Sequence, residues 1–484
     1  MDQSSLKTKT INGVFWQFCQ KGVGQLVSFA ISVLLARLLM PEEFGVVALA
    51  GMFTLLTSIF IDCGMGTALV QKKNADDLDY CTLFWAQTVL SLLIYAIIFI
   101  LAPWFSLLFH STKLTAVVRV LALGMIWGSL GGIQNAIITR QMAFKVYFYV
   151  TFIGSALSGI IGICLAYYGW GVWALVAQNL SSSILGSLII LIQVRWVPHF
   201  RFSYERFKGL FSFGWKLLVI NLLSTFNHQL KGYLIGWRYS SADLAYYNRG
   251  EGIPGIIYRN IQGSIDSVMF PALSKLQDDT QSVKRALRRS MQISSFFCMP
   301  FLFGLAAISD KLIIMLFTEK WAAAIPFMQI ICLTSCFDTL SMANLQALKA
   351  IGRSDTLLKL EFIKRPVMTA LLIIAVFISP LAIAASMCLY GFIAFVVNAF
   401  PNKVHISYSV SDQMIDVCPS FLCSIAMALA VFMVGRIEMN PYICIFLQII
   451  LGIFLYVVFS RKFNKENYLY VIDNVKEKIS HKKG

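Results

Sequence analysis

Ionisable side chains inside long apolar stretches are the residues of this chain that could do chemistry. Eight cations and six acids fall within segments that are otherwise apolar. Placing such a side chain in a bilayer costs roughly 2.5–3.5 kcal/mol, so it usually faces a water-filled cavity or an opposite charge. Among the acids, Asp62, Asp338 and Glu361 are candidates for binding a coupling ion. Pairing with a neighbouring Lys or Arg within the membrane is the alternative role for each.

The first apolar stretch carries an ordered polar stripe. Gln17, Lys21, Gly24 and Ser28 follow an i, i+4, i+7, i+11 pattern, which places them on one face of a helix. Such a face lines an aqueous cavity, where Lys21 meets water or an anion, or it makes hydrogen bonds between helices. The pattern predicts Gln17 and Lys21 as substrate-binding residues.

Two lysines share a later apolar stretch. Lys216 and Lys231 are fifteen residues apart, or ~22 Å along a helix, so they lie near opposite ends of a membrane span. Both are candidate substrate-binding residues.

The following stretch contains a sequence that disfavours a regular helix. Residues 247–255 include three glycines and Pro254, which predict a break or kink. Discontinuous helices often mark transporter binding sites. We therefore add Asn248, Arg249 and Arg259 to the candidate substrate-binding residues, with a simple kink and an internal Arg259–Asp266 pair as the alternative.

The candidate substrate-binding residues carry a net positive charge. Arginine and lysine bind pyrophosphate through charge-assisted hydrogen bonds, while amides and aromatic rings suit sugar hydroxyls and sugar faces. An exporter of cationic drugs would need the opposite charge. The pattern favours an anionic, sugar-bearing substrate.

These side chains are positioned by about fourteen apolar stretches, of roughly 20 to 30 residues each, between Ile11 and Ser460. A bilayer core of about 30 Å needs ~20 residues per helix. Backbone groups have no water partners in lipid, so these stretches must be helical. The chain is 58% hydrophobic and only 13% charged. We predict an all-α polytopic membrane protein with about fourteen transmembrane helices.

The distribution of basic residues predicts the topology. Of the 40 Lys and Arg residues, 26 fall in alternate gaps beginning with the N-terminus, and six fall in the opposite gaps. By the positive-inside rule both termini are cytoplasmic. The net charge of +16 therefore reflects topology, and nucleic acid is not an expected partner.

A repeat divides the chain. Trp16, Arg37 and a short acidic turn recur about 200 residues later as Trp215, Arg238 and a similar turn. Six spans separate the copies, so both halves have the same orientation, as in transporters with parallel repeats. The predicted parts are a six-helix bundle (1–195), a cytoplasmic linker (196–206), a second pseudo-symmetric six-helix bundle (207–402) around a shared central cavity, two further helices (403–460) and a basic cytoplasmic tail (461–484).

Signatures of enzymes and metal sites are absent from the sequence. It has no GxxxxGK[ST], HExxH or GxSxG motif, and its eleven cysteines lack metal-ligand spacing. We expect no catalytic residue, metal or cofactor. A transporter of this kind is driven by an ion gradient, by a substrate gradient or by removal of product.

Five segments of the sequence resemble a known family. The segments 13–16, 34–45 and 61–71 look like Wzx-type polysaccharide exporters of the multidrug/oligosaccharidyl-lipid/polysaccharide (MOP) exporter superfamily. The segments 245–250 and 268–279 look most like the colanic-acid exporter branch, which serves lipopolysaccharide biosynthesis. The resemblance covers nearly the whole chain.

This resemblance implies a function. It implies that undecaprenyl-pyrophosphate-linked oligosaccharide units are flipped from the cytoplasmic to the periplasmic leaflet of a bacterial inner membrane by alternating access, for capsule, exopolysaccharide or O-antigen synthesis. Expected partners are this lipid-linked substrate, membrane lipids, and a polysaccharide polymerase with chain-length proteins. The alternatives are another substrate on the same fold, such as a peptidoglycan lipid precursor or a drug, and a membrane-embedded polymerase or ligase.

Overall fold

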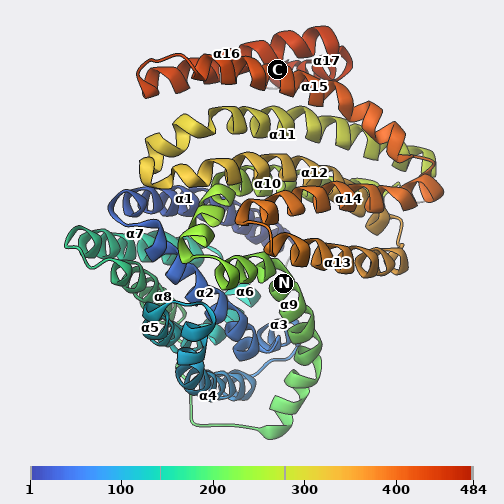
Figure 1. Ribbon diagram of the computed structural model, residues 1–484. Helices are drawn as coiled ribbons and strands as arrows, with labels where there is room; N and C mark the ends of the chain where they lie inside the picture. Colours follow the sequence, from blue (N-terminus) through green and yellow to red (C-terminus); the bar gives the residue numbers. More distant parts are fainter. Residues whose placement is uncertain (1–2, 142, 277–278, 481–484) are drawn as a thin grey trace. The chain divides into compact units, whose positions relative to one another are not determined.

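The computed structural model describes residues 3–141, 143–276 and 279–480, and every element in these ranges is a helix (Figure 1). The chain forms two compact units, Met1–Ala245 and Tyr246–Gly484. The helices of the first unit are α1 (Gln3–Leu38), α2 (Pro41–Asp62), α3 (Met65–Gln71), α4 (Asp77–Leu108), α5 (Thr112–Leu130), α6 (Gly132–Gln141), α7 (Lys145–Tyr167), α8 (Val172–Val194) and α9 (Tyr204–Arg238).

The second unit begins within the helix that follows. Its elements are α10 (Ser241–Ser274), α11 (Thr280–Phe317), the 3₁₀ helix η1 (Glu319–Ala324), α12 (Ile325–Ala350), α13 (Ser354–Val376), α14 (Pro380–Ile406), α15 (Val410–Gly435), α16 (Pro441–Phe463) and α17 (Lys465–Ser480).

Membrane-spanning length and composition recur along the described part of the chain. Twelve helical segments there are long and apolar enough to cross a membrane, which confirms a multi-pass all-α protein. Helices α10 and α13 have 34 and 23 residues, enough to span, but they are more polar. The count of fourteen spans stays a prediction.

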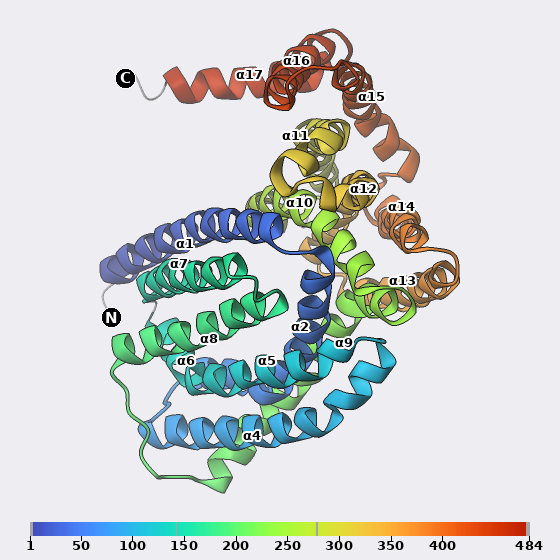
Figure 2. The same cartoon turned by 60° about the vertical axis from the view of Figure 1, so that its left-hand side comes forward.

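The two units repeat one packing order. In the first unit α7 packs on α8, α8 on α5 and α5 on α4, and Figure 2 shows these helices stacked as a row. In the second unit α13 packs on α14, α14 on α12 and α12 on α11, which Figure 1 shows in the same way. The spans of each predicted bundle can be numbered one to six in chain order. With this numbering, both rows follow the order five, six, four, three. This order supports the predicted internal repeat.

The turns that begin the repeats also match in atomic detail. A two-residue turn joins α1 to α2, and another joins α9 to α10. In the first, the backbone N–H of Met40 donates to the Glu43 carboxylate at 2.9 Å. In the second, the backbone N–H of Ser240 donates to the Asp243 carboxylate at 3.1 Å. The acidic residue that recurs in the sequence therefore has the same capping role in both copies.

A helix break that the sequence analysis missed separates α2 from α3. Cys63 and Gly64 have positive φ angles of 47° and 66°, which end one helix and start the next. Helix α9 crosses close to this break: a Cβ on Gly214 would lie 2.4 Å from the Cys63 carbonyl oxygen. Only glycine at position 214 permits this approach of two backbones.

A polar cluster fixes the chain between α8 and α9 to the first unit. The carboxylate of Asp79 is fully buried and accepts from Lys72 Nζ at 2.6 Å and from Arg206 Nη1 at 3.1 Å. Trp196 Nε1 donates to Asp77 Oδ1 at 2.9 Å. We call Lys72, Asp79 and Arg206 the Asp79 cluster; it joins the ends of α3, α4 and α9.

Asp76 caps helix α4 beside this cluster. Its side chain accepts from the backbone N–H of Asp79 at 3.0 Å, and Arg206 Nη2 lies 3.2 Å from its other oxygen. The hydrogen bond from the Asp79 N–H is the main cause that lowers the pKa of Asp76 below its ordinary value, and the attraction of Arg206 is a smaller one.

Candidate functional site

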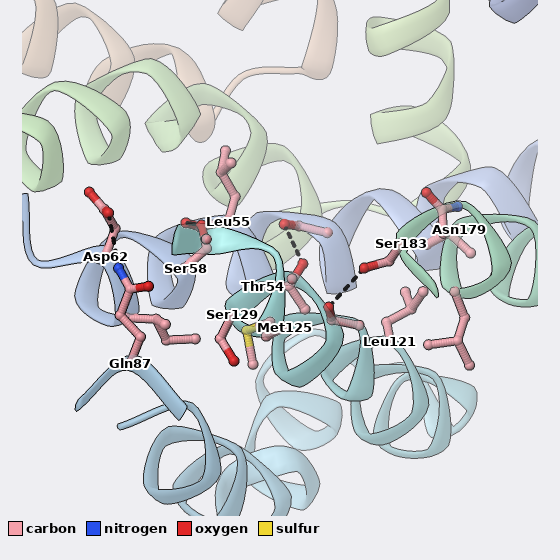
Figure 3. A pocket seen from close by; sticks show the side chains of 17 residues that line it. Thr54, Leu55, Ser58, Asp62, Gln87, Leu121, Met125, Ser129, Asn179 and Ser183 are labelled. Atoms are coloured by element: carbon pink, nitrogen blue, oxygen red, sulfur yellow. Dashed lines mark hydrogen bonds between the residues drawn. The ribbon is translucent and has the colours of Figure 1, made fainter. Parts of the chain in front are cut away.

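A cavity of about 490 Å³ lies within the first unit, between α2, α4, α5, α6 and α8 (Figure 3). In Figure 3, Asp62 and Gln87 lie at one end and Asn179 and Ser183 at the other. Of the described residues that line this cavity, none is Lys or Arg. Its polar lining consists of Thr54, Ser58, Asp62, Gln87, Ser129, Asn179 and Ser183.

The polar lining offers mainly hydrogen-bond acceptors. Ser183 Oγ donates to the Gly124 carbonyl at 2.8 Å, and Ser58 Oγ donates to the Leu55 carbonyl at 2.7 Å. Asn179 Nδ2 donates to the Leu175 carbonyl at 2.8 Å. A hydroxyl has one donor and two acceptor lone pairs, so the two serine bonds use the hydroxyl donors and leave acceptor capacity, while Asn179 keeps its carbonyl acceptor and a second N–H donor. Such a wall suits a ligand rich in O–H donors.

Asp62 stands at the α2–α3 break, where the cavity ends. Its carboxylate accepts from the backbone N–H of Gly64 at 3.2 Å and from Gln87 Nε2 at 3.4 Å. The Gln87 Oε1 atom is buried and has no hydrogen-bond partner in the described part of the chain. The half-buried carboxylate therefore borders the cavity of about 490 Å³ with another acceptor nearby, which is an arrangement that can take up a proton or a cation.

A smaller polar pocket, of about 130 Å³, adjoins the α1 stripe. It is lined by Ser28, Ile31, Ser155, Ser158, Gln178, Asn179 and Ser182, so Asn179 borders both cavities. On the stripe, Gly24 is buried against Thr151 of α7, and beside the stripe Gln20 Nε2 donates to Thr151 Oγ1 at 3.2 Å. Ser28 of the stripe therefore lines a polar pocket, while the hydrogen bond between helices comes from the neighbouring Gln20.

The predicted substrate-binding residues of the first unit lie apart from these cavities. Gln17 is half-buried and Lys21 is exposed on α1. On α9, Lys216 is exposed and Lys231 is half-buried. None of the four lines either cavity. Their contact with substrate stays a prediction.

Helix α10 differs from the expectation of a broken helix. It continues without interruption from Ser241 to Ser274 and includes Pro254. Its N-terminal part packs closely on η1 and α12, since a Cβ on Gly250 would lie 2.8 Å from the Met328 backbone nitrogen. Tertiary packing on this side supports a helix that local sequence disfavours.

The candidate residues on α10 have distinct environments. The Arg249 guanidinium lies 4.5 Å from the Phe317 ring centroid and 4.6 Å from that of Trp321. Asn248 is half-buried, and Arg259 is exposed with its guanidinium beside Gly255. The side chain of Asp266, its suggested partner, lies outside the described residues. Arg249 therefore has a cation–π environment that holds it in place.

The two candidate coupling acids of the second unit also differ. Glu361 contacts Lys364 Nζ at 2.6 Å and Arg365 Nε at 2.9 Å on the same helix, α13. This is the pairing that the sequence analysis weighed as the alternative. Asp338 on α12 is half-buried. Asp62 is the candidate acid that lines a cavity.

An apolar groove of about 620 Å³ lies within the second unit, on α10, α11, α15, α16 and α17. Two of its polar members are hydrogen-bonded: Gln448 Nε2 donates to the Val431 carbonyl at 2.9 Å, and Tyr456 Oη donates to the Phe296 carbonyl at 2.7 Å. The remaining lining is almost entirely hydrocarbon, which suits a lipid chain. It includes Ile257, Phe297, Phe301, Leu305, Ile308, Met427, Ile453 and Val457.

The sequence analysis did not single out the neutral polar wall. Asn179 and Ser183 belong to the run 178–183, Gln-Asn-Leu-Ser-Ser-Ser, inside an otherwise apolar span. That run was a usable signal, because amides and hydroxyls in a span seek partners within the protein or water. The prediction from sequence rested on formally charged residues and therefore did not include this neutral run.

Repeated rows of spanning helices with a polar cavity in the membrane region define a polytopic transport protein. More particularly, the chain belongs to the family described as polysaccharide biosynthesis protein, whose model matches residues 34–326. This confirms the family that the sequence suggested.

Named relatives agree with this membership. The succinoglycan biosynthesis transport protein ExoT of Rhizobium meliloti (strain 1021) is 26% identical over 72% of this chain and 71% of its own. The lipopolysaccharide biosynthesis protein WzxC of Escherichia coli (strain K12) is 21% identical over 74% of each chain. The solved structure of lipid II flippase MurJ, in an inward closed conformation, has the same fold: it gives a TM-score of 0.75 at 16% identity, covering 94% of this chain and 99% of that one.

Proposed function

We propose that this protein flips undecaprenyl-pyrophosphate-linked oligosaccharide repeat units from the cytoplasmic to the periplasmic leaflet by alternating access, for capsule, exopolysaccharide or O-antigen synthesis. The family and its transport-protein relatives support this class of substrate. They favour transport over a membrane-embedded polymerase or ligase.

The observation that carries the proposal is the polar cavity of the first unit, which offers hydroxyl and amide acceptors to a ligand rich in O–H groups. Sugars are ligands of this kind. The second unit has, within itself, a hydrocarbon groove that suits a lipid chain. A small cationic drug has no use for a wall of acceptors without an acid-rich lining.

The pyrophosphate would be bound by the basic side chains that the sequence analysis selected. Lys21 and Lys216 are exposed and therefore accessible to an anion, as is Arg259. Arg249 is enclosed by two aromatic rings, so we assign it a supporting role for helix α10. Export should fall when Lys21, Lys216 or Arg259 is changed to Ala, at unchanged membrane abundance; normal export in all three variants would contradict this assignment.

Asp62 is the acid that we propose couples transport to an ion. It lies at a helix break, lines the polar cavity and accepts from Gln87 Nε2, and the oxygen of the same amide is buried with no partner among the described residues. Glu361 is less suited because Lys364 and Arg365 already neutralise it. Asp338 remains the second candidate.

The proposed cellular arrangement follows the charge distribution. Both termini lie in the cytoplasm of a bacterium, the protein crosses the inner membrane, and bundles 1–195 and 207–402 alternate around the substrate. Membrane lipids surround the protein. A polymerase with chain-length proteins would receive the flipped units, because the product is a repeat unit on the periplasmic side.

Depletion of the protein in its own host tests the proposal. Surface polysaccharide should disappear, while complete lipid-linked repeat units accumulate on the cytoplasmic leaflet. Unpolymerised repeat units on the periplasmic leaflet would instead indicate a polymerase. Unchanged polysaccharide and lipid-linked pools would contradict the proposal.

A peptidoglycan lipid precursor is the second candidate substrate, because the fold is that of a lipid II flippase. In the same depletion experiment, this substrate would give cell lysis and cytoplasmic accumulation of the precursor. Loss of polysaccharide at normal growth distinguishes the two.

A further inference from the structure

The last helix, α17, begins at the membrane surface. Helix α16 has 23 residues, or ~34 Å, which is enough to cross a hydrocarbon core of about 30 Å. The basic segment that follows was expected to be a tail without assigned structure, but residues Lys465–Ser480 form a helix. Its position directly after a span places α17 at the headgroup layer.

A chain of polar contacts fixes the start of α17. Asn464 leaves the helical conformation, with φ −131° and ψ 43°, and its Nδ2 donates to Ser420 Oγ at 2.9 Å. Asn467 Nδ2 donates to Asn464 Oδ1 at 2.8 Å, and Arg289 Nη1 donates to Asn467 Oδ1 at 3.0 Å. The Arg289 guanidinium also lies 3.3 Å from the Tyr470 ring centroid. Figure 2 shows α17 leaving the end of α16 as a separate helix.

One side of α17 faces the unit itself. Tyr468 and Val471 pack on the apolar cluster that includes Phe296 of α11 and Met427 of α15, and Ile472 lines the apolar groove. This contact fixes the rotation of α17 about its own axis. It therefore also fixes which side chains of α17 point away from the unit.

Among the side chains of α17 that the structure describes, the exposed charges lie on two stripes of opposite sign. Lys465, Leu469 and Lys476 share one stripe, at spacings of i, i+4 and i+11, and all three are exposed; Leu469 is 44% exposed. Glu466 and Asp473 are seven residues apart on a different stripe, about 70° around the helix, and are also exposed. A helix in the membrane plane has this pattern, with cations at the edge of the apolar face and acids toward water.

We propose that α17 is an in-plane helix that binds the headgroups of anionic phospholipids through Lys465 and Lys476, with Leu469 inserted between them. Arg461 and Lys462, exposed at the end of α16, extend the same basic surface. The positive charge of this basic surface complements an anionic lipid surface. The binding is independent of the transported substrate, so it can be tested without measuring transport.

Hydrogen–deuterium exchange of the full-length protein in nanodiscs provides the test. One set of discs contains phosphatidylcholine alone, and the other contains phosphatidylcholine with phosphatidylglycerol. Each basic residue near an anionic surface changes affinity about fivefold, so the α17 amides should exchange about tenfold or more slowly with phosphatidylglycerol. Raising the salt concentration should remove the difference.

Matched variants locate the effect. Lys465→Gln with Lys476→Gln should abolish the response to phosphatidylglycerol, whereas Lys465→Arg with Lys476→Arg should keep it. Glu466→Gln with Asp473→Asn controls for charge changes on the other stripe and should also keep it. Three results would overturn the proposal. They are equal exchange in both lipids, an unchanged response in the Gln variant, and slower exchange only after soluble proteins are added. The last outcome would identify α17 as a protein-docking helix.

Discussion

Replacing Asp79 by Asn should destabilise the first unit strongly. The Asp79 carboxylate is fully buried, with contacts of 2.6 Å to Lys72 and 3.1 Å to Arg206. Asn keeps the shape of the side chain but removes the negative charge that both cations share. The prediction concerns the free energy of unfolding of the unit that ends at Ala245.

The expected loss of stability depends on the two hydrogen bonds to cations and on the exposure of Lys72 and Arg206. Hydrogen bonds to charged groups contribute roughly 1.5–3 kcal/mol each, which gives about 3–6 kcal/mol for two cations. The side chains of Lys72 and Arg206 are 32% and 37% exposed, so water recovers part of this loss. We expect about 2–3 kcal/mol, or a fall in Tm of about 5–10 °C for a unit of this size.

Thermal unfolding of the purified protein in detergent measures this effect. Asp76→Asn is the matched control, because the Asp76 side chain is 52% exposed and contacts Arg206 at 3.2 Å. This control should lower Tm by less than about 2 °C. Equal Tm values for wild type and Asp79→Asn would refute the view that this cluster holds α3, α4 and α9 together.

Three further predictions concern the break, the coupling acid and pH. Gly214→Ala should sharply lower membrane abundance, because its Cβ would lie 2.4 Å from the Cys63 oxygen, whereas Gly209→Ala has open space and should express normally on immunoblots. Asp62→Asn should reduce polysaccharide export at least tenfold at normal abundance; normal export would exclude it as the coupling acid. The lowered pKa of Asp76 stabilises the folded unit above the unfolded value of about 4, and this contribution should disappear as pH falls through the lowered folded value. Tm measured against pH in wild type and Asp76→Asn checks this, since the variant should lack that part of the acid response.

The spans and the repeat could be predicted because they depend on local composition. Hydropathy along the chain locates helices whatever their neighbours, and Glu43 and Asp243 have the same capping role in their two turns. The α2–α3 break escaped prediction because Cys63 and Gly64 lie within a continuous apolar run. Its cause is the crossing with Gly214, about 150 residues away in sequence.

The polar partners could not be predicted for a related reason. The Arg288 side chain meets the buried Asp416 at 2.7 Å across 128 residues, and Asp79 meets Arg206 across 127. A single sequence shows which charges lie in a span, but the packing of helices decides which of them meet. The neutral cavity around Asn179 likewise arises only when α2, α5 and α8 come together.

The central claim is that this protein moves a lipid-linked oligosaccharide between leaflets. The most direct measurement reconstitutes the purified protein in vesicles that contain a polyprenyl-pyrophosphate-linked oligosaccharide, with an ion gradient across the membrane. A membrane-impermeant sugar-modifying enzyme outside then reports which oligosaccharides face outward. The account predicts that inward-facing oligosaccharides become accessible with time in vesicles that contain the protein. Accessibility fixed at the level of protein-free vesicles, with and without the gradient, would contradict it.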